Sequence, residues 1–94
     1  MRKILNPQNL SFSNIIAYNF LTMNESQQIL YMQVRILRMC KERFGLSFKQ
    51  AAELFRKFNV PDFIEKCFGI FHVEGDDAVF EETKAYLLAK GASL

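Results

Sequence analysis

The sequence predicts a mainly α-helical domain of about four helices, with a short β-hairpin before the last helix. Three observations support this fold class. Apolar residues recur every three or four positions in several segments, residues that typically begin and end helices flank these segments, and the period changes after Gly69. A chain of 94 residues, half of them apolar and ten of them phenylalanine, can build one hydrophobic core. We therefore expect a single helical domain over residues 24–94, preceded by an extension over residues 1–23.

The first helix is expected to begin after Asn24. Asn24 and Gln27 have the spacing of a capping box, in which each side chain bonds the backbone N–H of the other residue. Apolar residues then follow the spacing of one helical face, and Leu30 and Val34 are expected to widen this buried stripe. The stripe comprises Ile29, Met32, Ile36, Leu37, Cys40 and Phe44. Gly45 is expected to end the helix in a left-handed conformation.

Two shorter helices are expected next. Ser47 and Gln50 form a second capping box, and the helix that they begin should end near Asn59. Its apolar face comprises Phe48, Ala51, Ala52, Phe55 and Phe58. Pro61 fits the first turn of a third helix over residues 60–68, because this turn leaves unpaired the N–H that proline lacks. The residues expected to face inward from the third helix are Phe63, Ile64, Cys67 and Phe68.

The β-hairpin is expected after Gly69, which should close the third helix. Residues 70–73 are β-branched or aromatic, apart from one histidine, and residues 78–80 could form the returning strand. Residues 74–77 have the composition of a turn, in which Gly75 is free to adopt a positive φ. An isolated hairpin is only marginally stable, so this one should pack against the helices.

The last helix is expected over residues 81–90. Glu81 and Glu82 lie where negative charge stabilises the start of a helix, Lys90 lies near its other end, and Gly91 is expected to end it. The residues expected to face inward are Thr83, Tyr86 and Leu87.

The first 23 residues differ in composition from the rest of the chain. They are rich in asparagine and serine, carry no charge after Lys3 and show no sustained apolar period. Residues 14–21 could form a helical turn or two against the core, or the segment could reflect an upstream reading of the start codon, and both alternatives stay open. Its apolar runs are too short and too interrupted for a signal peptide or a membrane span, so we expect a cytoplasmic protein.

Several short motifs together resemble a known family. They are Gly45-Leu46-Ser47-Phe48, Ala52-Glu53-Leu54-Phe55, Asn59-Val60, Phe63-Ile64, Phe71-His72-Val73-Glu74-Gly75, Glu81-Glu82 and Tyr86-Leu87. In this order they resemble the small bacterial proteins grouped as domain of unknown function 3791, over about residues 28–91. That family has no established activity, so the resemblance implies no catalytic residue. Its members are often encoded beside other small proteins, some of them resembling ADP-ribosyltransferases, which implies a partner, antitoxin-like or immunity-like role.

The net charge of +2 conceals a separation of charge along the chain. Residues 35–66 hold eight basic and four acidic side chains, whereas residues 74–90 hold five acidic and two basic ones. Opposite charges on one small domain favour docking to a charged protein partner or head-to-tail self-association, with charge setting rate and specificity more than affinity. The residues expected to bind a partner are Arg35, Arg38, Lys41, Arg56, Lys57, His72, Glu74, Asp76 and Asp77.

No residue pattern predicts an enzyme, a metal site or a cofactor. His72 is the only histidine, and with Cys40 and Cys67 it lacks the paired short spacings of a zinc site. We expect its ring to pack on the helices, with one nitrogen bonded to a backbone carbonyl or a side chain. Both cysteines are expected to be reduced and to face apolar surroundings. The glycines occur singly at element ends, so no phosphate-binding loop is expected.

We therefore expect a small non-enzymatic protein-interaction module. The alternative is a nucleic-acid-binding regulator of the winged helix-turn-helix kind, because two short helices followed by a hairpin have that outline. Asp62 and Glu65 on the third helix, and the acids of the hairpin turn, would be repelled by phosphate. Nucleic-acid binding is therefore the less favoured class.

Overall fold

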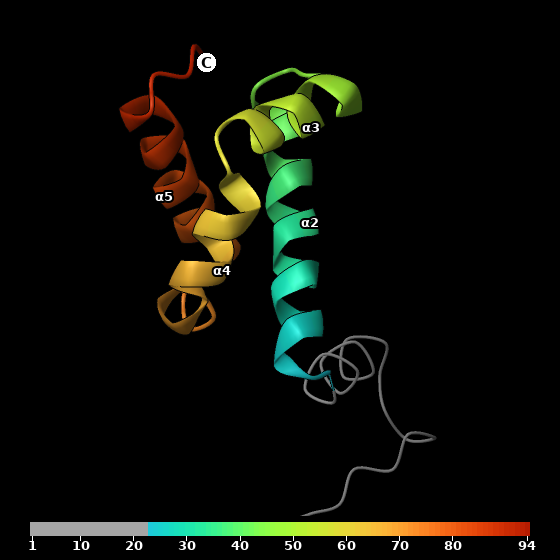
Figure 1. Ribbon diagram of the computed structural model, residues 1–94, viewed down its shortest axis with the longest axis vertical. Helices are drawn as coiled ribbons and strands as arrows, with labels where there is room; N and C mark the ends of the chain where they lie inside the picture. Colours follow the sequence, from blue (N-terminus) through green and yellow to red (C-terminus); the bar gives the residue numbers. More distant parts are fainter. Residues whose placement is uncertain (1–22) are drawn as a thin grey trace, which may run out of the picture.

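The structure is a computed structural model that describes residues 23–94, and these residues form four α-helices (Figure 1). In chain order they are α2 (Glu25–Arg43), α3 (Phe48–Lys57), α4 (Val60–Phe71) and α5 (Asp76–Ala89). The predicted extension over residues 1–23, with its predicted helical turns over residues 14–21, lies outside the described residues except for Met23. No helix within residues 23–94 has the length and apolar character needed to cross a lipid bilayer.

The start of α2 confirms the predicted capping box. The Asn24 side chain accepts a hydrogen bond from the Gln27 backbone N–H at 2.9 Å, and the Gln27 side chain accepts one from the Asn24 N–H at 3.1 Å. Met32, Ile36 and Cys40 are buried along the predicted stripe. Because these positions are four residues apart, they lie on one side of the helix.

The predicted widening of that stripe is wrong. Leu30 is 60% exposed and Val34 is 40% exposed. The other three described helices contact α2 (Figure 1), and within residues 23–94 no helix covers Leu30 and Val34. Apolar spacing identified the helix correctly, but it did not show how much of its circumference has a neighbour.

The second predicted capping box is also confirmed, at the start of α3. Ser47 Oγ accepts from the Gln50 N–H at 3.1 Å, and the Gln50 side chain accepts from the Ser47 N–H at 2.9 Å. Of the residues expected to face inward, Ala51 and Phe55 are buried, whereas Phe48 and Ala52 are exposed. Packing of α3 on α2 and α4 therefore buries only a narrow side of this helix.

The connections between the first three helices depend on two residues with positive φ. Gly45 adopts φ 65° after α2, as predicted. Asn59 adopts φ 54° between α3 and α4, and asparagine is one of the few non-glycine residues that tolerate this left-handed conformation. Pro61 lies in the first turn of α4, also as predicted. The turn at Asn59 is short enough to bring α3 and α4 side by side.

The predicted β-hairpin is wrong, because residues 23–94 contain no strand. Helix α4 continues through Gly69 to Phe71, and the chain turns only over residues 72–75 before α5 begins at Asp76. Ile64, Phe68 and Phe71 are all buried, at spacings of four and three residues. Burial of Phe68 and Phe71 on one helical side outweighs the local β preference of the segment, since tertiary packing routinely overrides propensity.

Helix α5 begins five residues earlier than predicted and takes up the residues assigned to the returning strand. Val79 and Phe80 are buried, as are the predicted inward residues Thr83 and Leu87. The Thr83 hydroxyl donates to the Val79 carbonyl at 2.9 Å, which satisfies the buried hydroxyl. Gly91 ends the helix at φ 95°, as predicted.

The core lies between α2 on one side and α4 and α5 on the other (Figure 1). Ile36, Ile64, Val79 and Leu87 are fully buried there. Aromatic rings surround these aliphatic residues in the following pairs: Phe44 with Phe80 at 5.4 Å between ring centroids, Phe63 with Phe71 at 5.5 Å, and Phe63 with Tyr86 stacked at 4.1 Å. The Tyr86 hydroxyl donates to the Phe58 carbonyl at 2.6 Å, which joins α5 to the turn between α3 and α4.

Candidate functional site

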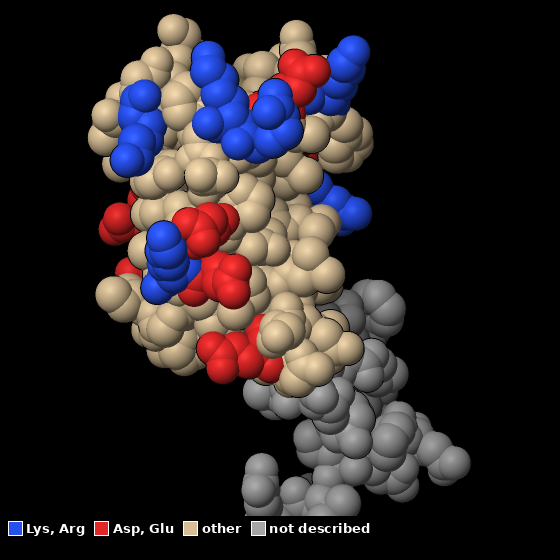
Figure 2. All heavy atoms as spheres, in the orientation of Figure 1, with Lys and Arg blue, Asp and Glu red and all other residues tan. Residues whose placement is uncertain are grey.

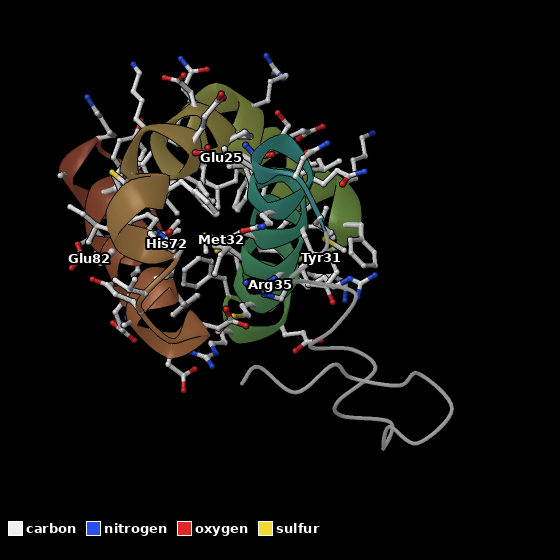
Figure 3. The ribbon with its side chains drawn as sticks, turned by 90° about the horizontal axis from the view of Figure 1, so that it is seen from below. Glu25, Tyr31, Met32, Arg35, His72 and Glu82 are labelled. Atoms are coloured by element: carbon white, nitrogen blue, oxygen red, sulfur yellow. The ribbon has the colours of Figure 1, made fainter. Side chains whose placement is uncertain are left out.

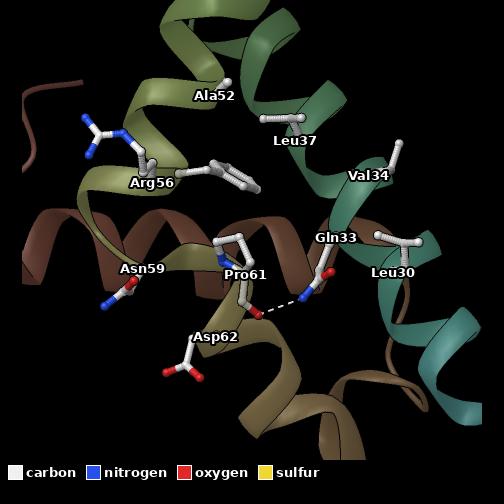
Figure 4. A pocket seen from close by; sticks show the side chains of 10 residues that line it. Leu30, Gln33, Val34, Leu37, Ala52, Arg56, Asn59, Pro61 and Asp62 are labelled. Carbon is white, nitrogen blue, oxygen red and sulfur yellow. Dashed lines mark hydrogen bonds between the residues drawn. The ribbon is translucent and has the colours of Figure 1, made fainter.

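An apolar groove of about 530 Å³ lies between α2, α3 and the start of α4 (Figure 4). We call it the α2–α3–α4 groove. Its lining residues are Leu30, Gln33, Val34, Leu37, Ala52, Phe55, Arg56, Asn59, Pro61 and Asp62. Most of them are apolar, which is typical of surfaces that bind apolar groups of a ligand or partner.

The groove follows from the exposed side of α2. Leu30, Val34 and Leu37 are spaced four and three residues apart, so their side chains lie in a row along the helix. Phe55 and Ala52 of α3 form the opposite wall, and Pro61 closes the groove toward α4 (Figure 4). The residues that the sequence assigned to a wider core stripe therefore line a groove instead.

One hydrogen bond fixes the distance between α2 and α4 at the groove. Gln33 Nε2 donates to the Pro61 carbonyl at 2.9 Å, between residues that are 28 positions apart in the sequence (Figure 4). A side-chain amide bonded to the opposite helix restrains both elements. This hydrogen bond therefore joins α2 to the start of α4 at the groove.

Charged side chains lie at the edge of the groove. Lys66 lies one turn beyond Asp62 along α4, and its Nζ donates a hydrogen bond to Asp62 Oδ2 at 3.0 Å. This hydrogen bond to a carboxylate raises the pKa of Lys66. Among residues 23–94, Arg56 takes part in no ion pair. The groove thus offers one cation available to a carboxylate of a bound molecule.

A second hollow, of about 340 Å³, continues the apolar surface toward the start of α2. It is lined by Met23, Gln27, Leu30, Tyr31 and Val34, and it shares Leu30 and Val34 with the α2–α3–α4 groove. Tyr31 lies on the side of α2 that points away from α4 (Figure 3). The exposed apolar surface is therefore continuous from Met23 to the groove.

The predicted basic and acidic partner surfaces contact each other within the chain. Arg35 Nε lies 3.0 Å from Asp76 Oδ2, and Arg35 makes two further hydrogen bonds of 3.2 Å to Asp76 Oδ1. Arg43 forms an ion pair with Asp77. Both pairs join α2 to the first turn of α5. Two acids expected to meet a partner therefore neutralise cations of the same molecule.

The other predicted basic residues lie on the surfaces of α2 and α3. Arg38, Arg56 and Lys57 are exposed, and Lys41 is half-buried with its Nζ 4.8 Å from the centre of the Phe48 ring. On the face drawn in Figure 2, most of the basic side chains gather over the end of the molecule that contains α3, and acidic side chains lie mainly below it. This end is the more positive one on that face.

His72 is exposed at the end of α4, and its ring lies against that helix. Its Nδ1–H donates to the Phe68 carbonyl at 2.9 Å, and its ring stacks on the Phe68 ring with 5.4 Å between centroids. The imidazole lies beside a shallow hollow of about 330 Å³ that Glu25 and Gln28 of α2 also line (Figure 3). The prediction that one ring nitrogen bonds a backbone carbonyl is confirmed.

The remaining reactive groups do not converge on a site. Within the described residues, no group of His, Cys, Asp and Glu side chains could hold a metal ion. Cys40 and Cys67 are free thiols, and burial raises the pKa of the Cys40 thiol to about 12, with Arg43 opposing the shift. Glu74, a predicted partner residue, is half-buried, and one of its carboxylate oxygens is buried without a hydrogen-bond partner in residues 23–94.

Sequence reasoning missed the groove, although one signal for it was present. Helix α2 carries apolar residues at positions 30, 31 and 34 in addition to the predicted stripe, so its apolar surface is wider than one helical stripe. The sequence also did not indicate that Gln33, Asn59 and Pro61 line the groove. Their place in it depends on contacts between helices that are distant in sequence, and no local pattern indicates these contacts.

Residues 23–94 thus form a small helical domain with an apolar groove on one side. The chain belongs to the family described as "Protein of unknown function (DUF3791)", which matches residues 31–90. This finding confirms the resemblance seen in the sequence, and the match includes most of α2 and all of α3, α4 and α5. Comparisons with curated proteins and with solved structures found no match.

Proposed function

We propose that this chain is a small non-enzymatic interaction domain that binds a protein partner in the α2–α3–α4 groove. The observation that carries the proposal is the row of Leu30, Val34 and Leu37 on α2, in which Leu30 and Val34 are exposed and Leu37 is half-buried, and which lines one groove with Phe55 of α3. An amphipathic helix binds such a groove by inserting residues spaced three and four apart.

The partner segment that fits is an apolar helix with a carboxylate near one end. Apolar side chains would cover Leu30 and Val34, and burying the exposed parts of these two residues would contribute about 1–2 kcal/mol. A carboxylate at the edge of the groove would meet the guanidinium of Arg56. Such an exposed pair adds association rate and specificity more than affinity.

The biological setting that we propose is a pairing with a protein encoded nearby, in an antitoxin-like or immunity-like role in the cytoplasm. This setting is supported by the family resemblance and not by any contact in the structure. The competing class, a winged helix-turn-helix regulator, loses its basis because the expected wing is part of α4 and α5. On α4, Lys66 is paired with Asp62, and Glu65 is exposed beside it.

The test uses two matched substitutions of exposed apolar residues to glutamate. Val34→Glu places a charge in the groove, whereas Leu88→Glu places the same charge on α5 outside it, where the leucine is 52% exposed. A partner captured from the native host with the wild-type chain would be identified, purified and titrated against each variant by calorimetry.

We expect the wild type and Leu88→Glu to bind alike and Val34→Glu to bind at least about tenfold more weakly, which corresponds to about 1.4 kcal/mol. Arg56→Glu should weaken binding less, and its effect should shrink as salt rises. Equal affinity of Val34→Glu and the wild type would overturn the proposal. Salt-dependent binding of labelled DNA that is lost in Arg38→Glu would instead support the nucleic-acid class.

A further inference from the structure

We propose that the α2–α3–α4 groove and a second hollow on the other side of α3 form one bipartite surface, on which the partner's apolar helix adjoins an acidic segment that crosses α3 at Arg56. This inference rests on the proposed function, because it names the chemistry of the segment that adjoins the same helix. The second hollow has a volume of about 460 Å³ and lies between α3 and the residues that follow α5. We call it the α3 hollow, and its lining includes Glu53, Leu54, Arg56, Lys57, Phe58 and Ala92.

Helix α3 separates the two hollows, and Arg56 lines both of them. Ala52 and Phe55 line the groove, whereas Leu54 and Lys57 line the α3 hollow, so the two hollows lie on different sides of one helix. In the view of Figure 4 the Arg56 side chain extends from α3 away from α2. A helix with its side chains is about 10 Å across, which about three or four extended residues can span. The acidic segment therefore begins within about four residues of the partner's apolar helix.

The two cations of the α3 hollow have no carboxylate partner within residues 23–94. Arg56 and Lys57 are both exposed, and the ion pairs of the described chain involve other cations, namely Arg35, Arg43 and Lys66. The Nζ atom of Lys57 lies instead 5.3 Å from the centre of the Phe58 ring. A carboxylate of the partner can therefore approach either cation without displacing an acid of this chain.

The surroundings of the α3 hollow add positive charge. Glu53 is the one acid among the described residues that line it. Lys49 on α3 and Lys90 at the end of α5 are exposed, and each adjoins a lining residue in the sequence. On the face drawn in Figure 2, basic side chains gather over the end of the molecule that contains α3. Charge complementarity across an interface raises the association rate and sets register, so this end suits an acidic segment.

The apolar part of the α3 hollow favours a protein segment over a nucleic acid. Leu54 and Phe58 are half-buried in its wall, and an apolar side chain of a peptide can cover what remains exposed of them. A nucleic acid binds mainly through its phosphates, and its affinity grows with the number of phosphates that cations neutralise. Because the α3 hollow has two cations beside Glu53, a short acidic peptide with an apolar residue fits it better.

The experiment titrates two synthetic peptides into the isotopically labelled full-length chain and follows its amide signals by nuclear magnetic resonance. Both peptides contain one amphipathic helix with leucines spaced three and four residues apart. Short runs of glutamate flank this helix in the first peptide, and equal runs of glutamine flank it in the second. We expect the glutamate peptide to bind about fivefold more tightly at low salt, because two exposed ion pairs form, and this advantage should shrink as salt rises. Only the glutamate peptide should shift the amide signals of Leu54, Lys57 and Ala92.

Three variants of the full chain locate the effect. Lys57→Gln lies outside the groove lining and should reduce the advantage of the glutamate peptide about twofold. Glu53→Gln removes a repelling charge and should increase this advantage by a similar factor. Lys84→Gln is the matched control, because Lys84 lies on α5 and lines neither hollow, and it should leave both affinities unchanged. Equal affinity of the two peptides at low salt, or an advantage that neither α3 variant alters, would overturn the proposal.

The failures of this inference and of the proposed function are distinguishable. If Val34→Glu weakens both peptides while their affinities stay equal, the groove binds the helix and only the bipartite surface is refuted. If the glutamate peptide shifts the amides of the α3 hollow and Val34→Glu leaves its affinity intact, the acidic segment binds without the groove, which counts against both proposals. Tighter binding of single-stranded DNA than of the glutamate peptide at the same amides would assign the α3 hollow to a nucleic acid and overturn this inference.

Discussion

Raising the pH above 9 is expected to destabilise the wild-type protein more steeply than a Cys40→Ala variant. Cys40 is fully buried in the core beside α5, and this burial raises the pKa of its thiol from 9.0 to about 12. In the unfolded chain the thiol ionises near its ordinary pKa. Between these two pKa values the unfolded state therefore binds fewer protons than the folded state, and the free energy of unfolding falls as the pH rises.

The magnitude follows from the separation of the two pKa values. Each pH unit between about 9 and 12 costs about 1.4 kcal/mol of stability, so the loss at pH 10 is about 1.4 kcal/mol. At neutral pH the Cys40→Ala variant should be less stable than the wild type by about 1–2 kcal/mol, because it leaves a small cavity. That deficit should nearly disappear at pH 10, since the variant has no thiol to ionise at this position.

The assay is urea unfolding at pH 7.5 and pH 10 for the wild type and two variants. Ile36→Val is the matched control, because Ile36 is fully buried one turn from Cys40 and its truncation removes no titratable group. The free energy of unfolding of Ile36→Val should be about 1 kcal/mol lower than that of the wild type at both pH values. If the free energy of unfolding of Cys40→Ala stays below that of the wild type by the same amount at pH 7.5 and pH 10, the reasoning is refuted. The thiol of Cys40 would then ionise as readily in the folded protein as in the unfolded chain.

Three further predictions concern contacts between the helices. A double-mutant cycle on Arg35→Ala and Asp76→Ala should give a coupling of about 0.5–1 kcal/mol that falls at high salt, and a coupling of zero at low salt would contradict it. Tyr86→Phe should lower the free energy of unfolding by about 1 kcal/mol by leaving the Phe58 carbonyl without its donor, as measured by urea denaturation. Asn59→Ala should cost about 1 kcal/mol of thermal stability while Asn59→Gly stays near the wild type, and equal values for both would argue against a required positive φ.

The helical part of the fold was predictable because its signals are local. The capping boxes at Asn24 and Ser47 need residues only three positions apart, and the glycines at 45 and 91 mark helix ends by their own conformational freedom. Met32, Ile36 and Cys40, which are buried in α2, have the four-residue spacing of one helical side. Each of these features is determined within about two turns of chain.

The β-hairpin was wrong because two local signals competed with the packing of distant residues. Isoleucine, phenylalanine and valine near position 70 favour a strand, and Gly69 is a common helix end. In the structure Gly69 is exposed within α4, where a Cβ would meet open space, so this glycine does not end the helix. Phe71 lies in the core between helices, and only the tertiary structure shows that its neighbours support a helix.

The candidate site was less predictable than the fold. The charge separation along the sequence is real, but Arg35 and Asp76 are 41 positions apart, and no pattern indicates that they pair. The groove depends on which side of α2 stays without a neighbour, and that is a property of how the helices pack. Periodicity shows that a residue is on an apolar side, but not whether another helix covers that side.

The small size of α3 has a consequence for how the groove behaves over time. This helix has ten residues, fewer than the other helices of the described region, and only Ala51 and Phe55 are buried in it. Segments with few buried contacts open locally at a lower free energy than the whole domain unfolds, so the amide hydrogens of α3 should exchange with deuterated water before those of α2. Because Phe55 lines the groove, whatever binds there would slow this exchange, and the hydrogen-bonded amides of α3 can serve as a native reporter of occupancy.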